Sequence, residues 1–390
     1  MRSVVRPLTS EEASALIHRR KRARIIHYMA SHPDSTETPD EIEESAVRAE
    51  DIRLTFSTLN VTRYPDVTLS DAEETALRTL KEKITDAIRE CAHREGEEEG
   101  KERKGGSGVF LKLSCRSPKD AALLSPSFAD VFSEEVHSLL LERELIQRLC
   151  SSLRTPIPFL DIIMCVAFCR SSLRSLRVRT SEEAMDLLFE SQRIFDDLLV
   201  YQSRVSHGIM RWDMEVLVRE WDDIDPACEV RAYVMNGRVT AMGQYQMTYF
   251  VPFFLDGHFR ESMQSAIFAL IDQILPHLPF KDFAIDFAPL QSDHSKIQII
   301  EINPPPPMAG TPMFQWADEE DRSILQNGPF EFRFIQEPDQ DCVMSVPPQW
   351  RQKMKEMVEC EHMDTIPTVD CEETPQEGTS SGSHNSCSIA

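Results

Sequence analysis

The chain has 390 residues, 41% of them hydrophobic, and a net charge of −23 at pH 7. This length allows roughly two to three domains with sizeable cores. The negative charge argues against a general binder of nucleic acids or acidic membranes, because contacts with phosphate groups need a basic surface. The basic run HRRKRAR, from His18 to Arg24, is a local exception. It could be a nuclear-import or nucleic-acid patch, although a solvated helix face is the more common case.

The cysteines and the apolar segments indicate the cellular compartment in which the protein is expected. The 10 cysteines are dispersed and form no CxxC pair, which favours reduced thiols in the cytosol over a disulfide scaffold. The first residues, MRSVVRPLTSEEAS, contain no apolar signal core. The longest apolar run, FLDIIMCVAF, is too short to cross a bilayer. We therefore expect a cytoplasmic protein with neither a membrane nor a nucleic acid as its partner.

The sequence divides into three regions. Residues 1–105 are predicted to be helical and acidic, with a polar, turn-rich insert. The charged and then glycine-rich stretch Glu95–Gly108 is typical of a linker. Residues 106–330 contain short strand-like segments separated by helical ones. Residues 331–390 form a C-terminal extension, and its tail beyond Glu359 is too polar to build a core.

Two strand-like segments early in the second region carry basic residues. VFLKLS, Val109–Ser114, predicts a strand with Lys112 and Ser114 on one face. The preceding KGGSG could bring backbone amides close to phosphate, but no GK[ST] follows, so this is not a Walker A loop. MEVLVREW, Met214–Trp221, predicts an apolar strand that contains Arg219. The second strand could line a nucleotide pocket or simply belong to the core.

Asn236-Gly237 between strand-like segments is a strong signal for a type I′ hairpin. Pairing around this turn places Arg231 opposite Met242 and Glu229 opposite Gln244. Glu229, Arg231 and Gln244 are then predicted to form a polar patch on one face of a sheet. An exposed face with an incidental ion pair is the simpler interpretation, and a ligand site is the alternative.

The segment IQIIEIN, Ile297–Asn303, combines a strand pattern with a carboxylate and an amide. Its isoleucines favour a pleated strand, and the run Pro304–Pro307 cannot continue a hydrogen-bonded ladder. With a side-chain period of two, Glu301 and Asn303 point to the same face. The sequence therefore places two oxygen-bearing side chains together at the end of a strand.

A second strand, FAIDFAPL (Phe283–Leu290), lies just upstream. A hairpin centred on Asp293 and His294 puts Asp286 opposite Glu301, and directly opposed like charges are unfavourable. A divalent cation held by oxygen ligands, such as magnesium shared with phosphates, would compensate for this repulsion. The alternative is a register shifted by one residue, or two acids that simply face water.

Several segments resemble the cell division cycle protein 123 family, whose fold is of the ATP-grasp type. The resemblance covers, in patches, residues 70–320, through VFLKLSCRSPKDA, LVREWDDIDPACEVRAYV, GQYQMTY, FAIDFAP, IIEINP and FQWADEE. Its most specific parts are Ser117–Ala121 after the lysine strand and the spacing from Asn303 to Phe314 and Trp316.

The resemblance implies an α+β, ATP-grasp-like two-lobed fold, with a nucleotide cleft between the lobes formed by residues 106–330. It implies ATP and magnesium as cofactors. The implied cofactor-binding residues are Lys112, Ser114, Val218, Arg219, Arg231, Asp286, Glu301 and Asn303. Among them Lys112 would contact ATP phosphate, and Val218 and Arg219 would line the adenine pocket. The implied ligands of magnesium are Asp286, Glu301 and Asn303.

Family members act as assembly factors for the heterotrimeric eukaryotic translation initiation factor 2 and bind its gamma subunit. The resemblance thus implies a monomeric ATP- and magnesium-binding assembly chaperone without catalytic residues, in which ATP hydrolysis is slow or absent. One alternative is an ATP-dependent carboxylate–amine ligase or kinase of the ATP-grasp type, which would need a second substrate pocket. Another is a degenerate ATP-grasp scaffold that binds no nucleotide.

The chain departs from the family at three positions, and the aromatic-rich N-terminal region of the family is not recognisable in it. Glu301 stands where the family usually has aspartate, but Glu-x-Asn is the commoner form across ATP-grasp enzymes. Gln244-Tyr245-Gln246 replaces a Gln-Arg-Asp run, with the loss of both charges. Leu111 stands in place of a proline. The resemblance is therefore stronger at the ATP site than at the partner surface.

Overall fold

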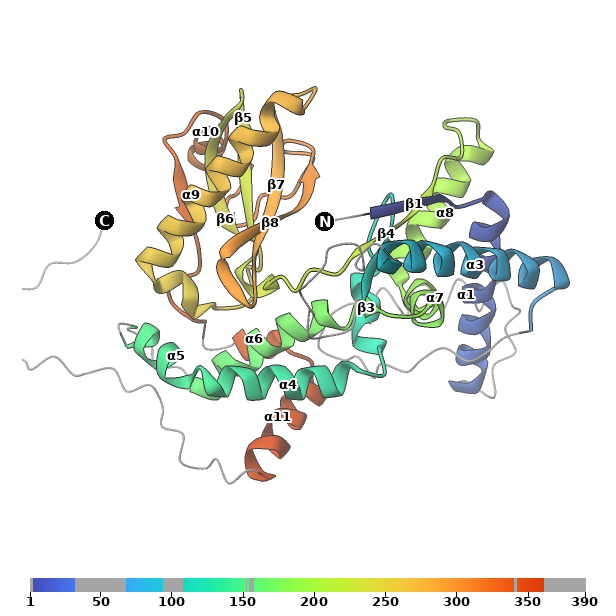
Figure 1. The fold of residues 1–390 in the computed structure, drawn as a ribbon, viewed down its shortest axis with the longest axis horizontal. Helices are drawn as coiled ribbons and strands as arrows, with labels where there is room; N and C mark the ends of the chain where they lie inside the picture. Colours follow the sequence, from blue (N-terminus) through green and yellow to red (C-terminus); the bar gives the residue numbers. More distant parts are fainter. Residues whose placement is uncertain are drawn as a thin grey trace, which may run out of the picture.

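The structure is a computed structural model that describes residues 3–31, 68–93, 108–151, 153, 158–339 and 342–360. Within these residues the chain forms two β-sheets, with helices packed against each (Figure 1). This mixture of helices and largely antiparallel sheets confirms the predicted α+β class. The predicted polar insert, most of the linker before Gly108 and the tail after residue 360 lie outside the described residues.

The first sheet has four strands among the described residues, in the order β1-β4-β2-β3. They are β1 (Ser3–Pro7), β4 (Glu215–Glu220), β2 (Val109–Leu113) and β3 (Arg177–Val178). The helices of this part are α1 (Ser10–Ser31), α3 (Asp71–His93), α7 (Ser181–Glu190) and α8 (Gln192–Ser206). Apolar residues of these strands and helices share one core. The described residues before position 105 therefore pack with β2 and β4 and have no core of their own.

The second sheet has five strands among the described residues, in the order β8-β7-β5-β6-β9. They are β5 (Val230–Met235), β6 (Arg238–Gln244), β7 (Phe283–Leu290), β8 (Asp293–Asn303) and β9 (Glu331–Arg333). One face packs on α9 (Gly257–Ile274) through residues such as Ile267 and Ile285. The other face packs on α10 (Glu319–Asn327) through Tyr233 and Leu325. Both faces are covered, which explains why β5 and β7 are buried along most of their length.

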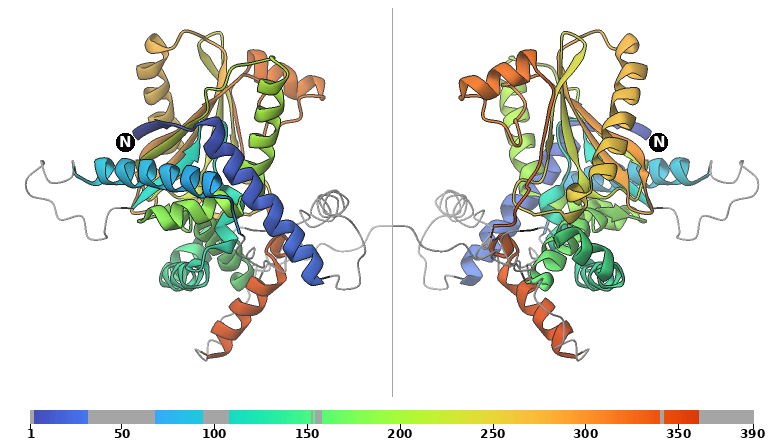
Figure 2. Two further views of the ribbon diagram at one scale, coloured as in Figure 1. Left: turned by 90° about the vertical axis from the view of Figure 1, so that its right-hand side faces the viewer. Right: turned by 90° about the vertical axis from the view of Figure 1, so that its left-hand side faces the viewer.

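A layer of helices lies beneath the second sheet (Figure 1). It comprises α4 (Phe128–Leu141), α5 (Arg143–Cys150), α6 (Phe159–Arg174) and α11 (Pro348–Cys360). Figure 2 shows α11 extending away from the sheets. The apolar run that begins at Phe159 forms α6, which is buried in the core shared with the second sheet. Among the helices that the structure describes, none has both the length and the hydropathy that a membrane span requires.

Short 3₁₀ helices connect the longer elements. They are η2 (Lys119–Leu124), η3 (Pro226–Cys228), η4 (Pro252–Leu255), η5 (Leu275–His277) and η6 (Cys342–Ser345). Two of them bear on the sites described below. η2 follows the lysine strand β2 and begins with Lys119, and η3 leads directly into β5.

The β5–β6 hairpin turns at Asn236-Gly237 as predicted, and both residues have positive φ (51° and 70°) as this turn requires. Its register differs from the prediction by one residue. Arg231 pairs with Gly243, because a β-bulge next to Tyr233 inserts one extra residue into β6. A bulge of this kind leaves no clear mark in the alternation of apolar and polar residues.

The β7–β8 hairpin has the predicted register at the functional end. Asp286 pairs with Glu301, as expected. The turn, however, is not centred on Asp293 and His294: it lies at Gln291-Ser292, and β8 already begins at Asp293. Two irregularities in the β7–β8 pairing, between Asp286 and Phe287 and between Pro289 and Leu290, shift the register back, so that Asp286 still pairs with Glu301 in spite of the different turn. The predicted pairing was therefore correct although the assumed turn was wrong.

Candidate functional site

The two sheets approach each other where β2 and β4 face β8. Lys112 Nζ lies 3.7 Å from Glu301 Oε2, and Arg219 Nη1 donates a hydrogen bond to the carbonyl oxygen of Ile300 at 3.4 Å. The Arg219 guanidinium also lies 4.8 Å from the ring centre of Phe110, its partner across the β2–β4 ladder. Lys112 shares this face of β2 with Phe110, as the strand alternation predicts. Basic residues of the first sheet therefore meet the acidic end of the second.

Arg231 and Asp286 form a buried ion pair directly behind this contact. Arg231 donates from Nε to Asp286 Oδ1 at 2.6 Å and from Nη2 to Oδ2 at 2.7 Å. Asn303 Nδ2 donates to the same Oδ2 at 3.0 Å. Asp286 is fully buried and Arg231 nearly so. The pair is bidentate, which is the strongest geometry for a guanidinium and a carboxylate.

The opposed charges of Asp286 and Glu301 thus have a compensating partner within the chain. The sequence predicts a divalent metal ion in that role, and in the structure the guanidinium of Arg231 neutralises Asp286. Burial raises the pKa of the Asp286 carboxyl, and the guanidinium of Arg231 opposes that shift. The same pairing raises the pKa of Arg231 in spite of its burial. Glu301, whose side chain is 39% exposed and only loosely paired with Lys112, is the more accessible carboxylate.

The proline run after β8 folds back over the second sheet. Arg231 Nη1 donates to the carbonyl oxygen of Gly310 at 2.9 Å, and the Tyr233 hydroxyl donates to that of Pro312 at 3.2 Å. The approach to β6 is so close that a Cβ on Gly243 would lie 2.5 Å from the Pro312 carbonyl oxygen. The prolines therefore end the ladder and direct the chain across β5 and β6, where it covers the ion pair.

Lys119, Glu229 and Tyr245 also belong to this cluster. The sequence offers Glu229 only as part of an alternative ligand site and does not predict Lys119 or Tyr245 as site residues. Lys119 Nζ lies 5.7 Å from the Tyr245 ring centre, and the Arg231 guanidinium lies 5.0 Å from the same ring. The negative charge of Glu229 raises the pKa of Lys119, although burial opposes the shift. The aromatic ring at 245 therefore stands between two cations, at a position where the family usually has arginine.

Sequence signals for these three residues were present. Lys119 lies in the Ser117–Ala121 run, the most specific part of the resemblance. Glu229 belongs to the predicted polar patch with Arg231, and Tyr245 is one of the departures from the family. What the sequence lacked was their position in space, because the η2 turn and the end of β6 come together only through tertiary packing.

Glu229 provides a pH-dependent test of this environment. Burial, with the nearby charges of Asp286 and Glu301, raises the pKa of Glu229 to about 7, although Lys119 opposes the shift. Between the ordinary pKa of 4.5 and this value the folded protein keeps a proton that the unfolded chain has lost. Stability conferred by this group is therefore complete at low pH and is lost as the pH rises through this window.

We expect Glu229→Gln, which stays neutral, to gain stability relative to wild type as the pH rises from about 5 to 8. Urea unfolding of both proteins at constant ionic strength measures this difference. A difference that does not change with pH would mean that Glu229 ionises equally easily in the folded and unfolded states.

The remaining predicted residues lie at the margin of the cluster or outside it. Ser114 is exposed, and its hydroxyl accepts a hydrogen bond from the backbone N–H of Glu215 at 3.2 Å. The Val218 side chain is fully buried in the core of the first sheet, and β4 is hydrogen bonded to β1 and β2 on its two edges. Gln244 pairs with Val230 and therefore lies on the core face, not in a patch with Arg231. Its amide bonds to backbone groups of the chain that follows β6.

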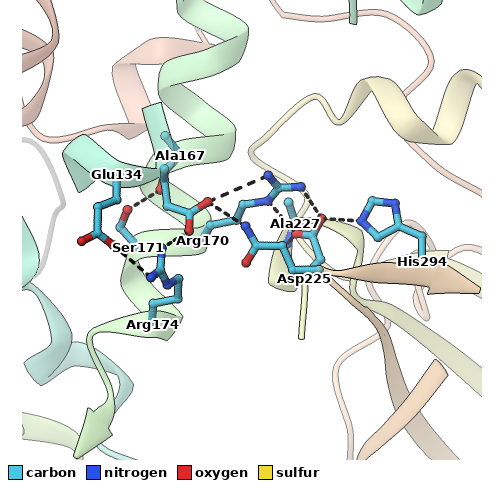
Figure 3. Close-up of polar contacts among 10 residues, drawn as sticks. Glu134, Ala167, Arg170, Ser171, Arg174, Asp225, Ala227 and His294 are labelled. Carbon is cyan, nitrogen blue, oxygen red and sulfur yellow. Dashed lines mark hydrogen bonds and ion pairs between the residues drawn. The ribbon is translucent and has the colours of Figure 1, made fainter. Parts of the chain in front are cut away.

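A second buried polar cluster connects α6 to the segment before β5 (Figure 3). Arg170 donates from Nε to Asp225 Oδ1 at 3.1 Å and from Nη2 to Oδ2 at 2.6 Å, and both side chains are at most 1% exposed. Glu135 Oε2 lies 3.9 Å from Arg170 and also accepts from Gln291. Burial alone would raise the pKa of Asp225, but Arg170 and His294 hold it below its ordinary value. This network ties the helical layer to the second sheet.

Part of this cluster has the composition of a metal site. Asp225, Cys228 and His294 each offer a ligand atom, and these atoms lie within 4.8 Å of one another. However, both Asp225 oxygens accept hydrogen bonds from Arg170, and His294 Nε2 lies 3.2 Å from Oδ2. Burial raises the pKa of the Cys228 thiol and so disfavours the thiolate that a metal would need. The ion pair accounts for these contacts without a metal.

Comparisons with known proteins bear on the identity of the chain. It is 32% identical over 133 residues to a protein of Vanderwaltozyma polyspora named translation initiation factor eIF2 assembly protein, a match that covers 32% of this chain and 34% of that protein. A protein of Candida glabrata named cell division cycle protein 123 is 26% identical over 131 residues, which covers 33% and 36%. The chain therefore spans about a third of the length of the curated relatives it matches.

A solved structure and a family model also match. The structure of Cdc123 from Schizosaccharomyces pombe has 18% sequence identity and a TM-score of 0.45, over 86% of this chain and 90% of that one. The model of the D123 family matches residues 168–362, which is half of the chain. That range contains Arg231, Asp286 and Glu301. The chain thus belongs to the D123 family, the cell division cycle protein 123 family that its motifs resemble.

Proposed function

We propose that this chain is an ATP- and magnesium-binding assembly chaperone for the eukaryotic translation initiation factor 2 complex. The observation that carries the proposal is the meeting of Lys112 on the first sheet with Glu301 on the second, in front of the Arg231–Asp286 pair. A nucleotide held between two sheets needs cations for its phosphates and a carboxylate for its metal ion, and these side chains supply both. Membership of the D123 family, with relatives named as eIF2 assembly proteins, supports the assembly role.

The phosphates would be held by the basic side chains on the cluster's first-sheet side. Lys112 and Arg219 lie on the face turned towards β8, and Lys119 lies beside Tyr245. We propose that the adenine adjoins Arg219 rather than the side chain of Val218, which is buried in the core. We propose that these residues line a nucleotide cleft of the ATP-grasp-like, two-lobed kind that the family resemblance implies.

Two of the three predicted magnesium ligands, Glu301 and Asn303, have an oxygen atom free to bind the ion. The Glu301 carboxylate is accessible, and the carbonyl oxygen of Asn303 remains available because its amide nitrogen is the atom bonded to Asp286. Asp286 itself has both oxygens engaged by Arg231. We therefore propose Glu301 and Asn303 as direct ligands, with Asp286 orienting Asn303 and Arg231. A bound magnesium ion would neutralise phosphate charge.

The partner would be the gamma subunit of translation initiation factor 2, bound beside the nucleotide cleft. Two apolar side chains on the segments that flank the cluster are exposed: Met308 at 74% and Met247 at 58%. Met247 Sδ accepts a hydrogen bond from the backbone N–H of Met313, which places it against the loop that follows the prolines. Flexible methionines suit a surface that adapts to a protein partner. Nucleotide would order this surface, and hydrolysis would be slow or absent.

Mutation of the cluster tests the nucleotide site. We expect Glu301→Ala and Lys112→Ala each to weaken magnesium-ATP binding at least tenfold, which is about 1.4 kcal/mol. Calorimetric titration measures the affinity. Lys296→Ala is the matched control, because Lys296 lies on the same strand β8, is 66% exposed and pairs only with Asp293 among the described residues. Equal affinity in wild type and Glu301→Ala would remove Glu301 from the site.

The same variants separate a chaperone from an enzyme. If nucleotide orders the partner surface, Lys112→Ala should reduce capture of the purified gamma subunit together with ATP binding. Lys296→Ala should change neither. Rapid ATP turnover on addition of a small amine or carboxylate, without capture of the gamma subunit, would instead support the alternative function of an ATP-dependent carboxylate–amine ligase.

A further inference from the structure

A cavity of about 320 Å³ lies at the turn end of the β7–β8 hairpin. Its walls come from α5, the η4–α9 segment and the hairpin turn, and its lining includes Leu145 and Leu149. Glu301 lies at the other end of β8, seven residues beyond His294, or roughly 23 Å at 3.3 Å per residue. The cavity is therefore separate from the proposed nucleotide site.

The polar groups that line this cavity are mainly hydrogen-bond acceptors. Glu142 is half-buried, and its carboxylate has no hydrogen bond or ion pair with any other described residue. Asp256 uses Oδ1 to accept from the backbone N–H groups of His258 and Phe259 at the start of α9, which leaves Oδ2 available. The Gln291 amide nitrogen donates to Glu135, so its carbonyl oxygen remains as an acceptor.

Aromatic rings form another part of the wall. Phe253 and Phe259 line the cavity, and their ring centres lie 5.1 Å and 5.5 Å from that of His294. His294 is the one basic side chain among the described lining residues, and its Nε2 is directed to Asp225 at 3.2 Å. The Phe253 ring already has a guanidinium, that of Arg170, 5.8 Å from its centre. Such rings favour a planar cation.

We propose that this cavity binds a guanidinium group on an apolar stem, as in an arginine side chain. A guanidinium has five N–H donors and no acceptor, which matches a wall of carboxylate and carbonyl oxygens. Its plane can stack on the phenylalanine rings, and its stem can pack on the leucines of α5. The volume is at the lower end of the range for ligand sites, so it suits a single side chain or a small molecule.

The test compares two probes of the same shape on the full chain. N-acetyl-arginine-N-methylamide carries the cation, and N-acetyl-citrulline-N-methylamide is its neutral isostere. We expect saturable NMR shift changes with the arginine probe and affinity at least tenfold lower for the citrulline probe. Glu142→Gln with Asp256→Asn should abolish this preference. Asparagine also caps helices well, so α9 should keep its N-cap. Glu144→Gln, an exposed neighbour on α5, should leave the preference unchanged.

N-butylguanidine distinguishes the two sources of a guanidinium. Tighter binding of this probe than of the capped arginine would indicate a small guanidine, and the reverse would indicate the side chain of a polypeptide. Either result supports the site. The proposal is overturned if the arginine and citrulline probes bind alike, if the arginine probe shows no saturable binding at millimolar concentration, or if the double variant retains the preference.

Discussion

Replacing Arg170 by methionine is expected to lower the free energy of unfolding by about 3 to 5 kcal/mol, the usual cost of removing one member of a buried ion pair. Methionine fills much of the same volume, so the loss would come mainly from charge. Asp225 would remain in the core without its bidentate partner, and Glu135, which is 1% exposed, would lose a nearby cation. Urea unfolding at neutral pH measures the change.

A matched control is Arg148→Met on α5, because Arg148 is exposed and should change stability by less than about 0.5 kcal/mol. Adding Asp225→Leu to Arg170→Met should recover part of the loss, since the stranded carboxylate is then removed. If Arg170→Met were no less stable than the Arg148 control, the network in Figure 3 would not hold the helical layer to the second sheet.

Replacing Asp286 by asparagine is expected to destabilise the nucleotide-free protein by about 3 kcal/mol. The variant leaves the guanidinium of Arg231, which is 5% exposed, without a counter-charge. Asparagine keeps one acceptor oxygen, which places the effect at the lower end of the range for a broken buried pair. The sequence alone predicts the opposite sign for the metal-free protein, because without a bound cation Asp286 and Glu301 are two facing acids that repel each other. Thermal and urea unfolding without nucleotide distinguish the two expectations.

Glu301→Gln is the control for the opposed charges. This variant removes the same repulsion by neutralising Glu301, the more exposed of the two acids. Glu301 contacts Lys112 only at 3.7 Å, so the free energy of unfolding should change by less than about 1 kcal/mol. Both variants remove the repulsion between the two acids, so an Asp286→Asn protein as stable as Glu301→Gln would show that the ion pair with Arg231 adds no net stability.

Much of the local structure followed from the sequence. Short strand-like segments predicted β2, β4, β5, β7 and the end of β8, and Asn236-Gly237 predicted its hairpin, because backbone propensity and turn chemistry act over a few residues. The motifs around Lys112 and Glu301 also predicted the family, which the family model confirms. The pairing of Asp286 with Glu301 was predicted because a period-two alternation limits the possible registers.

The sequence did not determine the exact registers along the hairpins. The bulge beside Tyr233 shifts the pairing of β6 by one residue. In the β7–β8 hairpin the turn lies at Gln291-Ser292, and two register shifts along the strands restore the predicted pairing of Asp286 with Glu301. A bulge adds one residue to one strand and changes the local twist of the sheet, and the alternation of apolar and polar residues does not mark where it occurs.

By itself, the sequence determined the α+β class, the family, and which strands carry Lys112, Arg231, Asp286 and Glu301. Only the tertiary structure decided which of these charges pair. Arg231 faces Asp286 because β5 and β7 are neighbours in the second sheet, although 55 residues separate them in the chain. Charges interact through distance and burial, and both are set when distant segments pack together. Asp286, which the sequence presents as a metal ligand, is in the folded chain one half of an ion pair with Arg231.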